Sequence, residues 1–394
     1  MTRFLFSVFL VSLVMISKAS GQEHLVIVEN TLSMERVFET VEIKLIDLGL
    51  SSDAAPAAFI VQEHTSKEEV VSQLIDSDMD GNADVLIFQP NLSKLSKKQY
   101  TIRSAKSNKS GQVQYCFSRF VPERTDDYAW ENNKVAFRTF GPIAQQMVEQ
   151  NIKGGTLTSG IDAWLKKVEY PIIDKWYEKT VNNKGSYHED TGEGLDNFHV
   201  GVSRGVGGIA VKKGDVYYTS KNFVRWNTIT TGPLRTCFVL EYEDWDAGGQ
   251  LISEKKTISL DYGSFLSKFE IELSGTEVIH AGLTLHEKDG ETHQHQHQQT
   301  KSGWVSYWQP HGDSALGTAI VVPNGNMRSS EVYLSDKKDL SNLYAEIETI
   351  NGKLIYYAGF GWKEAKEFTS KKDWETYLEV TSIKINNPLQ VTIH

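Results

Sequence analysis

The chain of 394 residues has two cysteines, and beyond its first residues it has no long apolar run. Cys116 and Cys237 stand in neither a CxxC nor a metal-ligand spacing, so the chain has no cysteine-based redox or metal motif. Both lie in strand-like segments, and they are either one disulfide of an exported protein or two buried small hydrophobic residues. Because no later apolar run approaches membrane-spanning length, we expect no membrane anchor.

Several catalytic motifs are also missing. There is no Walker loop, H-E-x-x-H or dinucleotide fingerprint, and His188-Glu189 lacks a second histidine four residues further on. Hydride transfer, phosphoryl transfer and zinc proteolysis therefore lose their usual sequence support. The net charge of −10 argues against nucleic acid as a partner, although a local arginine cluster can still bind a small anionic substrate.

The N-terminus has the pattern of a secretory signal peptide. Arg3 precedes an apolar stretch over residues 4–16, and Ala19-Ser20-Gly21 form a small-residue cleavage site. This pattern predicts that residues 1–21 are removed and that the mature protein is exported. No cysteine directly follows the apolar stretch, which excludes a lipid-anchored form.

The rest of the chain reads as strands. Short segments of period two over residues 22–106 predict a small N-terminal β-sandwich-like unit. Over residues 107–394, strand follows strand without βαβ alternation, which predicts an all-β fold: a large antiparallel β-sandwich with few short helices. We expect a short helix within residues 157–179, where apolar residues recur at helical spacing, and a helix or a strand pair at residues 370–385.

One N-terminal loop resembles a calcium-binding loop. It carries oxygen ligands at alternate positions and Gly81 at the sixth position, and its acidic residues are Asp76, Asp78, Asp80 and Asp84. The twelfth position is Ile87 instead of a bidentate Glu, which disfavours a helix–loop–helix site. A structural calcium ion and a simple Asp-Gly turn both stay open.

Residues 187–208 form the densest group of titratable side chains. The segment combines Tyr187, His188 and Arg204 with a second histidine, six glycines and four carboxylates, which are Glu189, Asp190, Glu193 and Asp196. It is either a functional loop or a solvated acidic loop, and we favour the first because ordering so many charges is costly without a ligand.

A second polar segment lies between two predicted strands, 112–121 and 134–140. The connecting loop, 122–133, carries acidic residues, Arg124 and Trp130. Arg138 shares a face of its strand with apolar neighbours, so it should have a carboxylate partner or a ligand.

Two groups of histidines leave their role open. His280 and His286 should face the same side of one strand. His293, His295 and His297 alternate in a polar segment that either binds a transition metal or is a low-complexity loop, and we favour the loop.

Four blocks of the sequence carry a family resemblance. They are RFVPERTDDYAWENNKVAFRTFGP (119–142), YPIIDKWY (170–177), YHEDTGEGLD (187–196) and TISLDYGSFLSKFEIEL (257–273). They resemble a family of exported bacterial proteins, first catalogued as a domain of unknown function, that includes the ulvan oligosaccharide dehydratase. The last block is also similar to the galactose-mutarotase-like sandwich.

The resemblance implies a periplasmic enzyme that acts on anionic oligosaccharides. It would remove water from the uronic acid at the non-reducing end and leave a 4,5-unsaturated sugar. Such a β-elimination needs a cation for the carboxylate, a base for the C5 proton and an acid for the departing O4.

We assign these roles from chemistry. His188 and Tyr187 fit the base and the acid in either order, and Arg124 fits the carboxylate clamp. Further candidates for contacts with the substrate are Arg119, Arg204, Trp130, Asp127 and Glu131. Glu189, Asp190 and Glu193 could orient His188 or hold a divalent cation such as calcium with it.

Three alternatives remain. The carboxylates could hydrolyse a glycosidic bond, or the protein could bind sugar, as a mutarotase-like module, without cleaving a bond. The charged residues could also be ion pairs that join two loops, such as Arg124 with Glu189.

Overall fold

The computed structural model describes residues 23–50, 58–105, 113–286, 290–297 and 302–394. Strands account for 48% of the protein and helices for 12%, so the predicted all-β class is confirmed. The described α-helices are α1 (Pro142–Glu149), α2 (Ile173–Val181) and α3 (Lys371–Asn386). The predicted signal peptide, residues 1–21, lies outside the described residues. None of the helices described is both long and apolar enough to cross a membrane.

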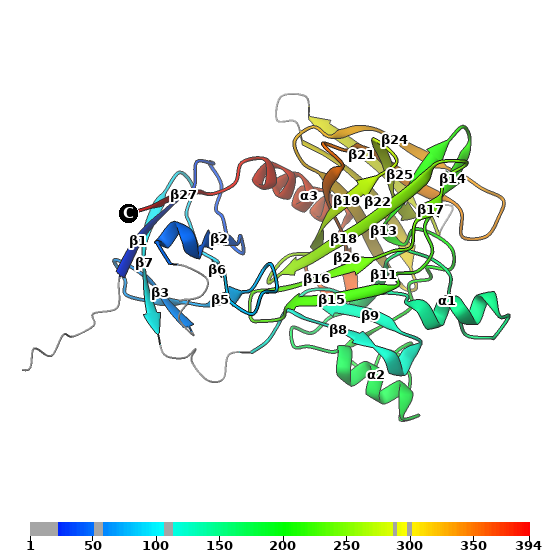
Figure 1. Ribbon diagram of the computed structural model, residues 1–394, viewed down its shortest axis with the longest axis horizontal. Helices are drawn as coiled ribbons and strands as arrows, with labels where there is room; N and C mark the ends of the chain where they lie inside the picture. Colours follow the sequence, from blue (N-terminus) through cyan, green and yellow to red (C-terminus); the bar gives the residue numbers. More distant parts are fainter. Residues whose placement is uncertain (1–22, 51–57, 106–112, 287–289, 298–301) are drawn as a thin grey trace, which may run out of the picture.

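Two small sheets form the N-terminal unit, which lies to one side of the molecule (Figure 1). The first has the order β27 (Gln390–Ile393), β1 (Glu23–Glu29), β7 (Lys97–Ala105), β3 (Ala58–Glu63), β4 (Glu69–Val70). The second has the order β2 (Val41–Lys44), β6 (Val85–Phe88), β5 (Ser72–Ile75), and a 3₁₀ turn, η1 (Leu45–Leu48), follows β2. Alternate apolar residues of both sheets form one core, including Val26, Val28, Ile43, Val61, Leu86, Phe88 and Ile102.

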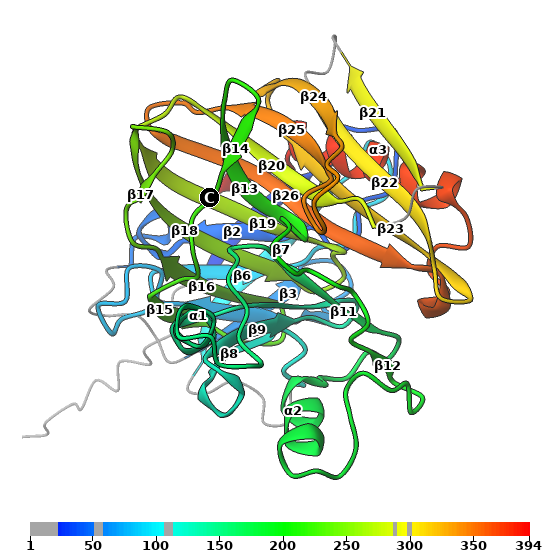
Figure 2. The same ribbon diagram turned by 90° about the vertical axis from the view of Figure 1, so that its right-hand side faces the viewer.

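Two larger antiparallel sheets form the main sandwich (Figure 2). The larger sheet runs β15 (Arg225–Thr230), β16 (Arg235–Glu241), β18 (Leu251–Asp261), β19 (Leu266–Ser274), β26 (Lys353–Trp362), β23 (Ser314–Val322), β22 (Ser302–His311), β21 (Glu291–His297), and β17 (Trp245–Asp246) pairs with β18. The smaller sheet runs β14 (Val216–Tyr218), β13 (Val206–Lys213), β20 (Val278–Thr284), β25 (Asn342–Glu348), β24 (Met327–Tyr333). Their inner faces share one large apolar core, as the predicted sandwich requires.

A further five-stranded sheet positions the residues discussed below. Its order is β12 (Gly194–Leu195), β11 (Asp162–Lys166), β10 (Ala136–Thr139), β9 (Asp127–Glu131), β8 (Phe117–Val121). Every residue of β9, β10 and β11 is buried. One face packs on the sandwich core, and on the other Trp164 contacts Trp176 and Tyr177 of α2.

This sheet corrects two predictions. Residues 162–166 are a strand instead of the start of a helix, and β9 lies within the predicted loop 122–133. A strand buried on both faces loses the alternation of polar and apolar residues, so its period cannot be recognised. The second part of the helical prediction holds, because α2 begins at Ile173, and residues 371–386 are a helix whose N-cap, Ser370, accepts from the Asp373 N–H.

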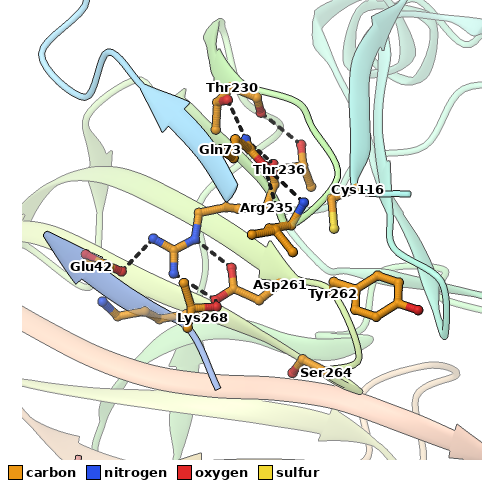
Figure 3. Close-up of polar contacts among 12 residues, drawn as sticks. Glu42, Gln73, Cys116, Thr230, Arg235, Thr236, Asp261, Tyr262, Ser264 and Lys268 are labelled. Atoms are coloured by element: carbon orange, nitrogen blue, oxygen red, sulfur yellow. Dashed lines mark hydrogen bonds and ion pairs between the residues drawn. The ribbon is translucent and has the colours of Figure 1, made fainter. Parts of the chain in front are cut away.

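Polar contacts fix the N-terminal unit against the sandwich (Figure 3). Arg235 binds both carboxylate oxygens of Asp261, at 2.6 and 2.7 Å, and reaches Glu42 of β2 at 2.6 Å. The amide of Gln73, on β5, donates to Thr230 and to the carbonyl of Arg235 and accepts the Arg235 N–H. The two units are therefore joined by an extensive hydrogen-bond network.

Both cysteines are free thiols in this arrangement. Cys116 is fully buried where its backbone bridges Gly232, and Cys237 lies on β16. Burial raises the pKa of both, that of Cys237 to about 12, so both are protonated at neutral pH.

Candidate active site

A buried arginine stands at the centre of a charged cluster on the β8–β12 sheet. The Nη2 atom of Arg138 donates to Asp162 at 2.5 Å and to Asp196 at 2.9 Å, and Nη1 lies 3.7 Å from Asp127. Asp162 faces Arg138 because the two residues are paired in the β10–β11 ladder. Although burial favours neutral arginine, the three carboxylates hold the pKa of Arg138 well above its ordinary value.

The carboxylates respond to the same burial in the opposite direction. Burial raises the pKa of Asp162 to about 7 and that of Asp127 to about 6, and it also raises the pKa of Asp196. Asp162, with a pKa of about 7, therefore gives up part of its negative charge near neutral pH.

The turn between β8 and β9 brings Arg124 to this cluster. A 3₁₀ turn, η3 (Pro122–Arg124), is followed by Thr125 and Asp126, both in the left-handed region with φ of 51° and 65°. A Cβ at Gly141 would lie 1.9 Å from the Asp126 carbonyl oxygen, so only glycine lets the two segments approach this closely. Consecutive non-glycine residues with positive φ are costly and often occur at functional sites.

Arg124 is half-buried, and its charge is not paired. Its Nε donates to the Tyr187 hydroxyl at 3.1 Å and its Nη1 to Thr125 at 2.8 Å. Across the residues that the structure describes, no carboxylate lies within 4.0 Å of its guanidinium, so the alternative ion pair with Glu189 does not form. Nη2 is thus available to a ligand.

Tyr187 lies beneath the two arginines. Its hydroxyl accepts from Arg124 and, at 3.3 Å, from Arg138, and the residue is only 3% exposed. The ring packs against Trp164. This position suits a residue that holds both guanidinium groups in place.

His188 is exposed and has one open ring nitrogen. Its Nδ1 lies 2.6 Å from the Asp196 carbonyl oxygen, so Nδ1 carries the proton of the neutral ring and donates it there. Nε2, which keeps its lone pair, can accept a proton from a ligand. The backbone N–H of Asp196 in turn bonds to the Tyr187 carbonyl, which ties the two ends of this loop together.

Arg124, Arg138 and His188 line one cavity of about 510 Å³, together with Asp162 and Asp196. Its walls come from β10, β11, the turn after β8, the end of α1 with residues 155–157, and the segments around residues 188 and 196–202. The residues that matter for the site are Arg124, Arg138, Asp162, His188, Asp196, Asn197 and His199. A cavity of this volume holds a small ligand such as one sugar ring.

The remaining predicted arginines lie elsewhere. Arg119 pairs with Asp174 and Glu123 beside α2. Arg204 is 2% exposed, and its guanidinium donates to Ser159 and Thr158 hydroxyl groups inside the sandwich. Neither arginine lines the cavity.

Two predicted contacts with the substrate are prevented by burial. Trp130 is fully buried in the sandwich core and donates to Ser267, so it has no face on which a sugar could stack. Glu131 is fully buried as well: it pairs with Lys166 at 2.7 Å and accepts the backbone N–H groups of residues 172 and 173 at the start of α2. Asp127, by contrast, belongs to the Arg138 cluster.

The three acidic residues proposed as metal ligands with His188 diverge. Asp190 pairs with Lys167 at 2.5 Å and accepts from the Gly192 and Gly194 N–H groups. Glu193 pairs with Lys175 and accepts from Trp176. Glu189 is exposed, and within the described part of the chain these residues form no common group of metal ligands.

The N-terminal acidic loop connects β5 and β6. Oxygen atoms of Asp76, Asp78 and Asp80 lie within 4.8 Å of one another, which fits a hard cation. Asp84 instead accepts from the backbone and hydroxyl of Ser77. The loop therefore offers three of its four predicted ligands to calcium, and binding itself stays a prediction.

The histidines of the two predicted groups lie in different surroundings. His280 is buried beside Tyr217 and Tyr344, whereas His286 contacts Phe198 near the cavity. His293 pairs with Glu375 of α3, and the side chains of His295 and His297 lie outside the described residues.

Sequence reasoning missed two residues of the cavity. Asp162 and His199 were not singled out, whereas the carboxylate partner or ligand predicted for Arg138 is confirmed by Asp162 and Asp196. An acidic residue inside the apolar run GIDAWL was a usable signal for Asp162, because a buried charge needs a partner. His199 had no comparable signal, since its partner is 140 residues away.

The fold and the cavity define an all-β sandwich protein with a polar, ligand-sized cavity. One solved structure of similar fold is a protein in the glycosyl hydrolase family 38 from Enterococcus faecalis, with a TM-score of 0.53 and 10% identity over 94% of this chain. An alpha-mannosidase from E. faecalis V583 was also found, with a TM-score of 0.44 and 11% identity over 94% of this chain. The chain spans about half the length of these structures, 47% and 46%.

The chain belongs to the family described as "Domain of unknown function (DUF4861)", whose model matches residues 28–391. One relative with a similar sequence is "Uncharacterized protein P7" of Formosa agariphila. It is 53% identical over 379 residues, which cover 96% of this chain and 95% of the relative.

Proposed function

We propose that this protein is an exported oligosaccharide dehydratase of the periplasm. It removes water across C4 and C5 of the uronic acid at the non-reducing end of ulvan-type oligosaccharides and leaves an unsaturated uronate. The sequence blocks that resemble the family of the ulvan oligosaccharide dehydratase support this substrate class, and the N-terminal signal pattern supports export.

The observation that carries the proposal is the unpaired Arg124 guanidinium beside His188 in one cavity. A uronate carboxylate bound to Arg124 would have its negative charge neutralised, which makes the C5 proton more acidic. The open Nε2 of His188 can take that proton. The raised pKa values of Asp127 and Asp162 reduce the negative charge that would repel the substrate.

Tyr187 has a supporting role in this proposal. Its hydroxyl orients Arg124 and Arg138 from below, and the residue does not line the cavity. We therefore expect Tyr187→Phe to weaken substrate binding more than it slows the chemical step.

The test uses defined saturated oligosaccharides that end in glucuronate or iduronate. We expect a loss of one water in mass together with rising ultraviolet absorbance. Arg124→Ala should lower kcat/KM about 10- to 100-fold, because a charge-assisted hydrogen bond to the carboxylate is lost. Arg119→Ala is the matched control, since Arg119 is bound to acidic neighbours outside the cavity, and it should change kcat/KM less than about twofold.

A hydrolase is the second candidate, because the raised pKa of Asp162 suits a general acid. Uptake of water and a new reducing end, without absorbance of an unsaturated uronate, would establish it. Unchanged mass and absorbance with every uronate-ended oligosaccharide would refute both enzymes and leave a sugar-binding protein.

A further inference from the structure

A second histidine lines the cavity and is held by a carboxylate. His199 Nε2 lies 3.0 Å from Asp339 Oδ2. From Asp196 to Val200 the chain alternates between buried and exposed residues, so Phe198 and Val200 anchor the segment in the core while His199 faces outward. The same segment thus supplies the carbonyl that orients His188 and a histidine for the cavity wall.

The pairing of His199 with Asp339 depends on unusual backbone geometry. Asp339 has φ of 64° and Gly201 has φ of 55°, both in the left-handed region. A Cβ on Gly201 would lie 2.1 Å from Asp339 Oδ2 and 3.0 Å from His199 Nε2. Only glycine at this position leaves room for the pair.

Neighbouring groups fix the backbone of His199 and leave its other nitrogen open. His286 Nε2 donates to the His199 carbonyl at 2.5 Å, and Gln309 contacts the second nitrogen of His286. Burial lowers the pKa of His286, which favours its neutral ring. Through the described part of the chain no hydrogen bond engages His199 Nδ1, just as none engages His188 Nε2.

We propose that His199 is the catalytic acid of the dehydration and that Asp339 is its positioning residue. The proposal rests on the proposed function. In the step, His188 Nε2 takes the C5 proton, the C–H electron pair becomes the C4–C5 double bond, and the C4–O bond breaks. The departing hydroxide takes the Nδ1 proton of the His199 imidazolium and leaves as water. Proton exchange with solvent then returns both rings to their starting states.

The acid role follows from the partners of the two rings. The Asp339 carboxylate lies 3.0 Å from His199 Nε2, where it can stabilise an imidazolium that carries the proton to the leaving group. The Nδ1 of His188 instead donates to the Asp196 backbone carbonyl at 2.6 Å and lies farther, at 3.6 Å, from the Asp196 carboxylate, which Arg138 already binds; this leaves Nε2 as an acceptor. Hydroxide is a poor leaving group, and elimination needs such an acid.

Kinetics with two leaving groups test the assignment. On the natural hydroxyl substrate, His199→Gln and His188→Gln should each lower kcat at least about 100-fold, with KM changed less than about threefold. On an analogue with fluorine in place of the C4 hydroxyl, the leaving fluoride needs no proton. His199→Gln should then recover to within about tenfold of the wild-type rate, whereas His188→Gln should not.

Two further variants provide the controls. His293→Gln removes another histidine–carboxylate pair, that of His293 with Glu375. Neither residue lines the cavity, so this variant should leave both rates unchanged. Asp339→Asn should lower kcat, and in long-range ¹H–¹⁵N spectra it should remove the preference for a proton on His199 Nε2 that the wild type shows. Equal melting temperatures of all variants exclude unfolding as the cause.

The outcomes separate the two proposals. If the wild type releases water but His199→Gln is unimpaired, or is impaired equally with both leaving groups, His199 is not the acid and the dehydratase proposal stands. If the wild type releases neither water nor fluoride from any uronate-ended substrate, the proposed function is wrong and the role of His199 falls with it.

Discussion

At the scale of single residues, Arg138 illustrates the energetic cost of burying a charged side chain and the position that this charge occupies. A fully buried guanidinium and three carboxylates must all leave water, and such networks add little stability compared with apolar side chains of similar size. The cluster is best explained by its position, because it forms the floor of the cavity beside Arg124 and His188.

Asp162 gives a prediction for the pH dependence of stability. Its pKa in the folded protein, about 7, is above its ordinary value of 3.8, so the folded state binds the proton more tightly than the unfolded state. The contribution of Asp162 to the free energy of unfolding should therefore be largest below about pH 4 and decline as pH rises through 7. Asn in its place cannot titrate.

Denaturant unfolding of the wild type and Asp162→Asn at pH 4.5, 6.0 and 7.5 measures this effect. We expect the wild type to become more stable relative to the variant as the pH falls. A difference between the two that does not vary with pH would show that Asp162 keeps an ordinary pKa in the folded protein.

At the scale of elements, the sequence correctly predicts strands that have one buried face and one face exposed to solvent. The N-terminal unit and the long strands of the sandwich alternate clearly, and they lie where expected. The prediction from sequence fails for β9 and β11. Their acidic residues Asp127, Glu131 and Asp162 are typical of loops, but here they are buried and bound to other side chains. Tertiary contacts satisfy these charges, and no local pattern reports them.

The site follows the same division. The density of titratable groups at 187–196 and 119–131 marked both segments, and the structure brings His188 and Arg124 to one cavity. The composition of the segments could not show which side chains reach the cavity, so Trp130 and Glu193 were included although both point into other surroundings.

Glu131 connects β9 to the start of α2, which gives a prediction at this scale. Glu131→Gln removes the charge that pairs with the fully buried Lys166. Because Lys166 is left buried without a counter-charge, we expect a loss of about 3–5 kcal/mol in the free energy of unfolding. Glu123→Gln breaks an exposed pair with Arg119 and should cost less than about 1 kcal/mol. Chemical denaturation compares the two; equal costs would contradict the proposed role of burial.

The β5–β6 loop gives a prediction about metal binding. If Asp76, Asp78 and Asp80 hold calcium, millimolar calcium should raise the free energy of unfolding by about 1–3 kcal/mol. Asp78→Asn combined with Asp80→Asn should abolish the increase, and magnesium should reproduce it only weakly. The same melting temperature with calcium and with chelator would identify the loop as a simple turn.

At the scale of the whole molecule, the hydrogen-bond network between the two units fixes the position of the N-terminal unit. Arg235 connects Asp261 of the sandwich to Glu42 of the N-terminal unit, and its side chain is only 14% exposed. The predicted boundary between the two units, at residues 106 and 107, stays a prediction. The C-terminal strand β27 crosses this boundary in sequence, because it belongs to the first sheet of the N-terminal unit.

Arg235→Ala should therefore loosen the joint between the two units. We expect a loss of about 3 kcal/mol in stability and a larger radius of gyration by small-angle X-ray scattering. Arg225→Ala is the control, because its pair with Glu241 is exposed, and it should alter neither quantity measurably. An unchanged radius of gyration in Arg235→Ala would mean that the remaining contacts alone hold the units together.

The pairing of β27 with β1 has a consequence for the order of events during synthesis. Val28 of the first strand pairs with Val391, so the first sheet cannot be completed until nearly the whole chain has left the ribosome. Until then β1 exposes an open strand edge, which is a site for wrong pairing. A chain that crosses a membrane before it folds would meet this requirement without penalty, because its first and last strands become available in the same compartment.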